Sequence, residues 1–130
     1  MKKLIEFKKH LRSKNIDAYI IPKYDLFFSE ELMEGDERLK FISNFSGSAG
    51  WGVITASNKL KSVVISDGRY QQQLKKEVSQ KEFVILDGGL NKIIEFLNSH
   101  KQIKIIGVDT KLITINQFKL LESELKIKNI

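Results

Sequence analysis

Apolar and polar positions along the chain follow periods that switch between helix and strand. Leu4, Phe7 and Leu11 recur at helical spacing among lysines, which predicts a first helix. Asn15 tolerates the left-handed conformation and is a plausible helix cap before residues 18–22, a short apolar run typical of a buried strand. The chain is therefore expected to open with a helix followed by a strand.

The next part of the chain lacks a clear period until residue 36. Residues 23–35 contain aromatic residues and three glutamates, and we interpret them as a long excursion. Asp36 can cap a helix with Leu39 and Ile42 on its apolar face, and the small residues 46–50 then break the pattern. A second helix and a tight turn are expected here.

Two apolar runs, residues 51–55 and 60–66, are separated by the turn residues Ser57-Asn58-Lys59. This pattern predicts a β-hairpin. Because the strands of a hairpin are antiparallel, a sheet that contains them cannot be wholly parallel.

Helices and strands alternate through the remainder of the chain. Tyr70, Leu74 and Val78 lie four residues apart on one helical face, and Thr114 with Gln117 has the spacing of a capping box at the start of a last helix. The other expected elements are a strand at 83–86, a helix at 90–97, a strand at 103–108 and a final strand at 126–130. The fold class predicted is α/β, with a mixed β-sheet flanked by helices in one domain over residues 1–130.

The chain carries a formal charge of +6, from 22 Lys and Arg against 16 Asp and Glu. The lysines occur in pairs such as Lys8-Lys9 and Lys75-Lys76, shorter than the runs of about 5–8 basic residues that mark nucleic-acid patches. We interpret them as solvated, so no nucleic-acid partner is expected and such a partner is the weakest alternative.

No apolar run reaches the roughly 20 residues of a membrane-spanning helix, and Glu6 and Lys8 interrupt any signal-peptide core. The absence of cysteine fits a reducing compartment. No membrane is expected as a partner, and a cytoplasmic location is the default expectation.

Candidate chemistry is sparse. His10 and His100 lie far apart in sequence without neighbouring ligands, so they predict no metal site and are interpreted as structural. Residues 46–50 only partly match a Gly-x-Ser-x-Gly motif and precede a strand, whereas a nucleophile elbow follows one. Trp51 is interpreted as core. No catalytic residue and no metal ligand is assigned.

The most suggestive local motif is Asp67-Gly68-Arg69-Tyr70, at a predicted strand-to-helix junction. Such junctions commonly face a ligand cleft in α/β folds. Arg69 and Tyr70 are therefore candidates for substrate access or for an interface. In the structural alternative, Tyr70 packs in the core and Arg69 pairs with Asp36 or Glu37.

Three motifs stand out in the first half of the chain: Asp36-Glu37-Arg38, the run 41–50 ending in Phe45-Ser46-Gly47-Ser48-Ala49-Gly50, and Ser66-Asp67-Gly68-Arg69-Tyr70. Together they resemble the N-terminal domain of Xaa-Pro aminopeptidases (aminopeptidase P), in the creatinase and prolidase family. Order and spacing agree over residues 16–75, and residues 76–130 agree in pattern. The resemblance implies a ribonuclease-H-like α/β fold.

The resemblance also implies a role. In that family a C-terminal domain releases an N-terminal residue preceding proline, with two divalent metals, usually manganese, held by two Asp, one His and two Glu. That catalytic domain is absent from residues 1–130, so the chain alone is expected to be inactive. The implied role is to shape the entry of short proline-containing peptides and to help assemble a homodimer, with its own C-terminal catalytic domain as partner.

A different class of function is a peptide- or histone-binding module without catalysis, because pseudo-peptidase relatives of this fold serve in histone chaperones. The lysine-rich composition argues against it, since a binder of basic partners gains from an acidic surface.

Overall fold

The structure is a computed structural model that describes residues 2–22, 43, 50–66, 68, 71–109 and 113–125. Several predicted features lie outside these residues: the excursion 23–35, most of the helix expected from Asp36, the turn at 44–49 and the strand expected at 126–130.

Among the described residues, five strands form one mixed sheet in the order β4-β3-β2-β1-β5. The pairs β1–β2 and β2–β3 are antiparallel, and the pairs β1–β5 and β3–β4 are parallel. The elements are α1 (Lys2–Ser13), β1 (Ala18–Pro22), β2 (Trp51–Thr55), β3 (Ser62–Ser66), α3 (Gln71–Glu77), β4 (Phe83–Asp87), α4 (Leu90–Ser99), β5 (Ile106–Val108) and α5 (Ile115–Glu124). The predicted hairpin and the mixed α/β fold are confirmed.

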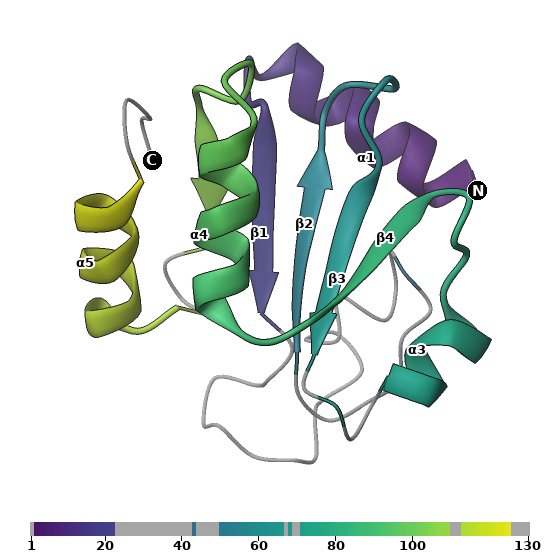
Figure 1. The fold of residues 1–130 in the computed structure, drawn as a ribbon. Coiled ribbons are helices and arrows are strands. Elements are labelled where there is room, and N and C mark those ends of the chain that lie inside the picture. The colour runs from purple at the N-terminus through teal and green to yellow at the C-terminus, as the bar shows by residue number, and fades with distance from the viewer. Residues whose placement is uncertain are drawn as a thin grey trace.

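Helices cover both faces of this sheet (Figure 1). Leu4, Leu11 and Leu74, from α1 and α3, join the core on one face, whereas Ile93 and Leu121, from α4 and α5, join the core on the other. Every residue of β2 and β3 is buried. The central hairpin therefore has no solvent-facing side and needs a helical layer above and below it.

Two polar residues, Asn15 and Asp17, fix the path of the chain from α1 into β1. Asn15 adopts the predicted left-handed conformation, with φ 60°, and the next amide, that of Ile16, donates to the carbonyl of Leu11 at 2.9 Å. The Asp17 carboxylate accepts the backbone N–H groups of Lys104 and Ile105, at 2.9 and 3.0 Å. Asp17 thereby attaches the beginning of β1 to the segment that leads into β5.

The strand expected at 103–108 is shorter than predicted, because β5 begins at Ile106. The backbone N–H groups of Lys104 and Ile105 bind the Asp17 carboxylate and that of Ile103 binds the carbonyl of His100, so these three N–H groups are not available to a strand ladder. Only the carbonyl of Ile105 takes part in the pairing with β1, by accepting from Asp17 and Ala18. The prediction of a longer strand was wrong because an apolar run does not reveal a side-chain acceptor that lies elsewhere in the sequence.

The start of the last helix was predicted correctly. Gln117 donates its backbone N–H to Thr114 Oγ1 at 3.1 Å, and Thr114 donates its own to Gln117 Oε1 at 3.0 Å. This reciprocal pair is the capping box, which satisfies two backbone donors at the beginning of α5.

Gly107 in β5 lies opposite Tyr19 in β1, and the tyrosine ring packs over the glycine. A Cβ atom at position 107 would lie 2.7 Å from Tyr19 Cδ2, closer than real contacts allow. The ring is also held by Phe7, with the two ring centroids 5.8 Å apart in an edge-to-face arrangement. Glycine is therefore required at this position by the space the ring occupies.

Gly107→Ala should lower the free energy of unfolding by about 1–3 kcal/mol, because the ring must leave its place beside Phe7. Urea denaturation followed by circular dichroism measures the change. Gly68→Ala is the matched control, since a Cβ there meets Asp87 Oδ2 at an ordinary 3.8 Å, and it should change stability by less than about 0.5 kcal/mol. Equal effects of the two substitutions would contradict the steric explanation.

Candidate functional site

Strands β1, β3, β4 and β5 all end on the same side of the sheet. We call this carboxyl-terminal side of the sheet the candidate functional edge. These four strands run in the same direction and β2 runs against them, so their carboxyl ends meet at one edge, opposite the β2–β3 turn (Figure 1). In α/β folds ligands commonly bind outside the carboxyl ends of the strands. The junction that carries Arg69 and Tyr70 in sequence follows β3 at this edge.

Gln71 fastens this junction to the neighbouring strand. Its side-chain amide Nε2 donates to the carbonyl of Ser66 at 3.0 Å and to that of Leu86 at 3.1 Å, at the ends of β3 and β4. The backbone N–H of Gly88 also donates to the Ser66 carbonyl, at 3.0 Å. These hydrogen bonds hold Gln71, the residue after Tyr70, against the ends of the parallel strands β3 and β4.

Arg69 and Tyr70 themselves lie outside the described residues, as does Asp67. Their assignment to substrate access or to an interface remains a prediction. The described neighbour Gly68 lies beside the Asp87 carboxylate, since a Cβ atom at Gly68 would be 3.8 Å from Asp87 Oδ2.

The carboxylates at this edge do not converge. Within the described part of the chain there is no group of three or more His, Cys, Asp or Glu residues that could hold a metal ion. Asp87 ends β4 and Asp109 follows β5, and these strands are the two opposite edges of the sheet. Four strand spacings separate them by about 19 Å, too far for a shared ion.

His100 and Trp51 contact neighbouring groups, whereas His10 is exposed. His100 Nδ1 lies 2.9 Å from the carbonyl of Phe96, and the two rings lie at a tilt of 44° with their centroids 4.5 Å apart at the end of α4. His10 is exposed on α1. Trp51 is 8% exposed and belongs to the core shared with α4 and α5, which confirms its interpretation as a core residue.

A groove of about 470 Å³ lies between β4 and α4. Its lining residues are Leu86, Asp87, Lys92, Glu95, Phe96 and Ser99. Lys92 Nζ is 3.7 Å from Glu95 Oε2, and the Ser99 hydroxyl donates to the carbonyl of Phe96 at 2.7 Å. The Ser99 hydroxyl also lies 3.0 Å from Nδ1 of the adjacent His100, which itself lies outside this lining.

Lys8 contradicts the interpretation of the lysines as solvated. Its side chain is only 5% exposed, because position 8 lies on the same helical stripe as Leu4 and Leu11. The ammonium donates to the carbonyls of Ser57 and Leu60, each at 3.1 Å, and to Thr55 Oγ1 at 3.4 Å. The spacing 4, 8, 11 was the available signal for this burial.

Burial lowers the pKa of the Lys8 ammonium below its usual value, because the charged form loses its hydration. The carboxylate of Glu82 acts in the opposite direction, and the guanidinium of Arg12 adds to the lowering. Arg12 Nη1 also donates to the carbonyl of Ala56 at 2.5 Å. Two cations of α1 therefore bind the turn that joins β2 and β3.

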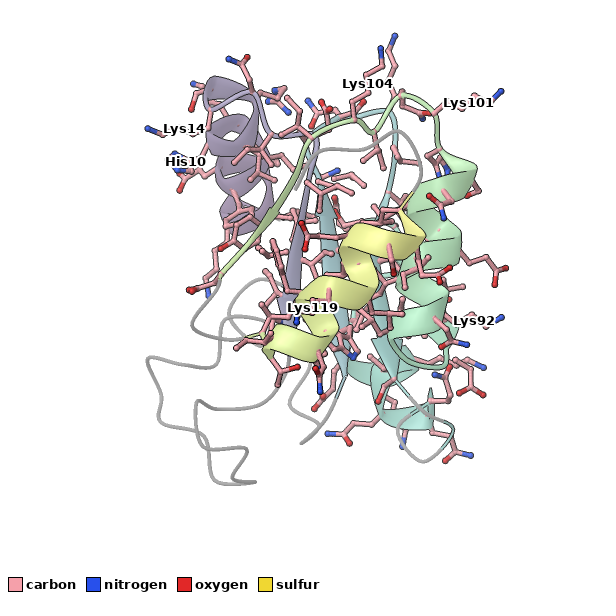
Figure 2. All side chains as sticks on the ribbon, turned by 90° about the vertical axis from the view of Figure 1, so that its left-hand side faces the viewer. His10, Lys14, Lys92, Lys101, Lys104 and Lys119 are labelled. Atoms are coloured by element: carbon pink, nitrogen blue, oxygen red, sulfur yellow. The ribbon has the colours of Figure 1, made fainter. Side chains whose placement is uncertain are left out.

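Several other described cations are distributed over the surface. Lys14, Lys101 and Lys104 lie around one end of the molecule, while Lys92 and Lys119 project from α4 and α5 (Figure 2). Lys14, Lys92, Lys101 and Lys104 point away from the body of the molecule (Figure 2), and Lys119 is exposed on α5. The positions of these five lysines agree with the prediction that most lysines are solvated.

Comparison with known proteins decides the family. The model of the creatinase/prolidase N-terminal domain matches residues 3–130. The chain belongs to this family. This match confirms the family that the motifs between residues 36 and 70 indicated.

Two relatives are aminopeptidases by name. The chain is 35% identical over 128 residues to a probable Xaa-Pro aminopeptidase P of Colletotrichum graminicola, an alignment that covers 95% of this chain and 20% of that protein. It is also 35% identical, over 133 aligned positions, to Xaa-Pro aminopeptidase 1 of Dictyostelium discoideum, covering 99% and 21%. The chain spans about a fifth of the length of these relatives.

Solved structures show the same fold. The X-prolyl aminopeptidase of Caenorhabditis elegans, described as a cytosolic enzyme with a di-nuclear active site, superposes with a TM-score of 0.77 at 26% identity, over 95% of this chain and 22% of that one. The N-terminal domain of the cytoplasmic peptidase PepQ of Mycobacterium tuberculosis also has a TM-score of 0.77, at 19% identity, covering 98% and 88%. Among the described helices, none combines the length and hydrophobicity that crossing a bilayer requires.

Lys8→Met should lower the free energy of unfolding by about 1–3 kcal/mol, because three acceptors at the β2–β3 turn lose a charged donor. The unfolded chain binds more protons at Lys8 than the folded chain over the pH interval just below 10.5, the usual pKa of lysine. The wild-type chain should therefore gain stability relative to Lys8→Met as the pH rises through that interval. Urea titrations at several pH values measure the difference.

The control for this experiment is Lys9→Met, which alters an exposed neighbour on the same helix. At a given pH it should change stability by less than about 0.5 kcal/mol. A difference between wild type and Lys8→Met that shrinks as the pH rises would show that the assigned direction of the pKa change is wrong.

Proposed function

We propose that this chain is the non-catalytic N-terminal domain of a Xaa-Pro aminopeptidase, a metallopeptidase that releases an N-terminal residue preceding proline. The observation that carries the proposal is the 35% identity over 95% or more of the chain to proteins of that name, of which it matches only about a fifth. Catalysis then belongs to the remaining four-fifths of such a protein.

The chemistry of the described residues supports this division. They hold no group of three or more metal-ligating side chains, and the carboxylates that end β4 and follow β5 lie on opposite sides of the sheet. The donor set of a two-metal centre therefore does not fit here. We propose that the ions, with manganese as the expected metal, are bound by a C-terminal domain of the longer protein in the cytoplasm.

The role we propose for the N-terminal domain is to restrict access. A proline-specific site must accept a tertiary amide that has no N–H, and a protein wall beside the cleft can exclude long peptides without binding short ones more tightly. The functional edge, where four strands end and where Gln71 holds the β3–α3 junction against β4, supports such a wall. Arg69 and Tyr70 are the residues we propose to reach the cleft or a partner subunit, and the domain also contributes to a homodimer.

The 130-residue chain should show no hydrolysis of an Xaa-Pro peptide in the presence of Mn²⁺, whereas a longer polypeptide that contains the downstream reading frame should be active. Release of the free N-terminal amino acid is the measurement, with and without a chelator. Metal-dependent turnover by residues 1–130 would contradict the proposal. A reading frame that ends without a metallopeptidase domain, together with specific binding of core histones, would instead favour the non-catalytic binding module.

Arg69→Ala in the longer enzyme should reduce the discrimination between short and long Xaa-Pro peptides, because an arginine that borders the cleft limits entry. The measurement is the ratio of kcat/KM for a tripeptide and a decapeptide, together with the oligomeric state. Lys119→Ala, a change of an exposed cation on α5, is the control and should alter neither quantity. Unchanged kinetics and an unchanged oligomeric state for Arg69→Ala would remove Arg69 from the site.

A further inference from the structure

The outer side of β4 carries backbone groups that no described strand pairs with. β4 is the last strand on its side of the sheet and its only strand neighbour among the described residues is β3. The carbonyl of Glu82 accepts from Ser62, and the N–H of Gly88 donates to Ser66, so the even-numbered residues face β3. Since alternate residues of a parallel strand face opposite neighbours, the N–H and C=O groups of Ile85 and Asp87 point outward.

Within the described part of the chain, β4 has no proline, bulge or covering strand on its outer side, and its one charged residue, Asp87, stands at its end. Natural edge strands are protected by charged residues, proline, bulges or a covering segment. Phe83–Leu86 is apolar, the ladder with β3 runs through all five residues in continuous register, and Val84 is 39% exposed. An apolar edge of this kind is suited to a second strand.

We propose that β4 is a self-association edge, at which two copies of the chain pair as antiparallel strands about a two-fold axis through Ile85. The inference rests on the proposed role of the domain in forming a homodimer and names the surface that would do so. The paired copies would form one continuous sheet in which β4 is no longer an edge.

The backbone of β4 is self-complementary in this register. Ile85 of each copy donates its N–H to the Ile85 carbonyl of the other, which makes two hydrogen bonds. Asp87 of each copy lies opposite Phe83 of the other and donates to its carbonyl, which makes two more. The N–H of Phe83 is not needed, because it already donates to the carbonyl of Ser79 at 3.0 Å.

The side chains agree with the same register. Val84 of one copy lies opposite Leu86 of the other, and Leu86 lines the groove between β4 and α4. The exposed Val84 therefore enters the groove of the second copy beside Leu86 and gains an apolar contact that it lacks in the single chain. Such cross-strand apolar pairs stabilise a sheet.

The charges around the groove also favour a second copy of this chain. Across the whole chain the charge is +6, which opposes self-association in general. Around this groove, Asp87 and Glu95 stand against Lys92, which is ion-paired with Glu95. The local charge is thus close to neutral, so two copies meet here without the repulsion expected at the lysine-rich end of the molecule.

The molar mass of the 130-residue chain, measured by sedimentation equilibrium, should rise toward twice that of one chain between about 10 µM and about 1 mM, as expected for a small interface. Val84→Lys should weaken the dimer by about tenfold or more, because it places a charge at the paired edge. Leu120→Lys is the matched control: it also replaces an exposed aliphatic residue with lysine, at a comparable exposure of 42% on α5, and should leave the dimer intact.

Cysteine cross-linking tests the register, because the natural chain contains no cysteine. Val84 and Leu86 of the two copies face each other as a pair without hydrogen bonds between them, with Cα atoms about 4.5 Å apart, which suits a disulfide. A mixture of the Val84→Cys and Leu86→Cys chains should therefore form the mixed disulfide in preference to either disulfide between identical chains.

A chain that stays monomeric throughout the concentration range would overturn the inference, and so would a Val84→Lys variant as dimeric as Leu120→Lys. Random cross-linking in the cysteine mixture would overturn the register. These outcomes concern residues 1–130 alone, so they are independent of whether the longer protein cleaves Xaa-Pro peptides. Failure of the interface and failure of the proposed peptidase role are therefore distinguishable.

Discussion

The burial of the β2–β3 hairpin on both faces is the constraint on which the rest of the structure depends. All ten residues of these two strands are buried, so each face must be covered by helices that the chain supplies on either side of the sheet. α1 is bound to the turn of the same hairpin through Lys8 and Arg12. The buried cation costs hydration, and the three oxygen acceptors around it offset that cost.

The same constraint divides the molecule into parts with different roles. Because β2 alone runs against the other strands, four strand ends gather at one edge, and the β3–α3 junction there is held by Gln71. The opposite end carries the hairpin turn and its lysine anchor. The described residues at both ends are held by backbone and side-chain hydrogen bonds, and they contain no group of three or more metal-ligating side chains.

Much of the fold was predictable from local patterns. The capping box of Thr114 and Gln117, the left-handed Asn15 and the hairpin around residues 57–59 each depend on neighbouring residues, so local sequence contains the needed information. The motifs between residues 36 and 70 identified the family, although Arg69 and Tyr70 lie outside the described residues. The burial of Lys8 and the short β5 were missed, because both depend on partners about 50 to 90 positions away, at Ser57, Leu60 and Asp17.

The sequence by itself determined the types and order of the described elements, the mixed sheet and the family, since periodicity, caps and turn residues act over a few positions. Only the tertiary structure decided that Lys8 is buried, that Gly107 must leave room for Tyr19 and that β4 is an edge beside a groove. Strand order and side-chain contact are set by which distant segments pack together. That packing depends on the summed burial and hydrogen bonding of the whole chain, so no single segment determines it.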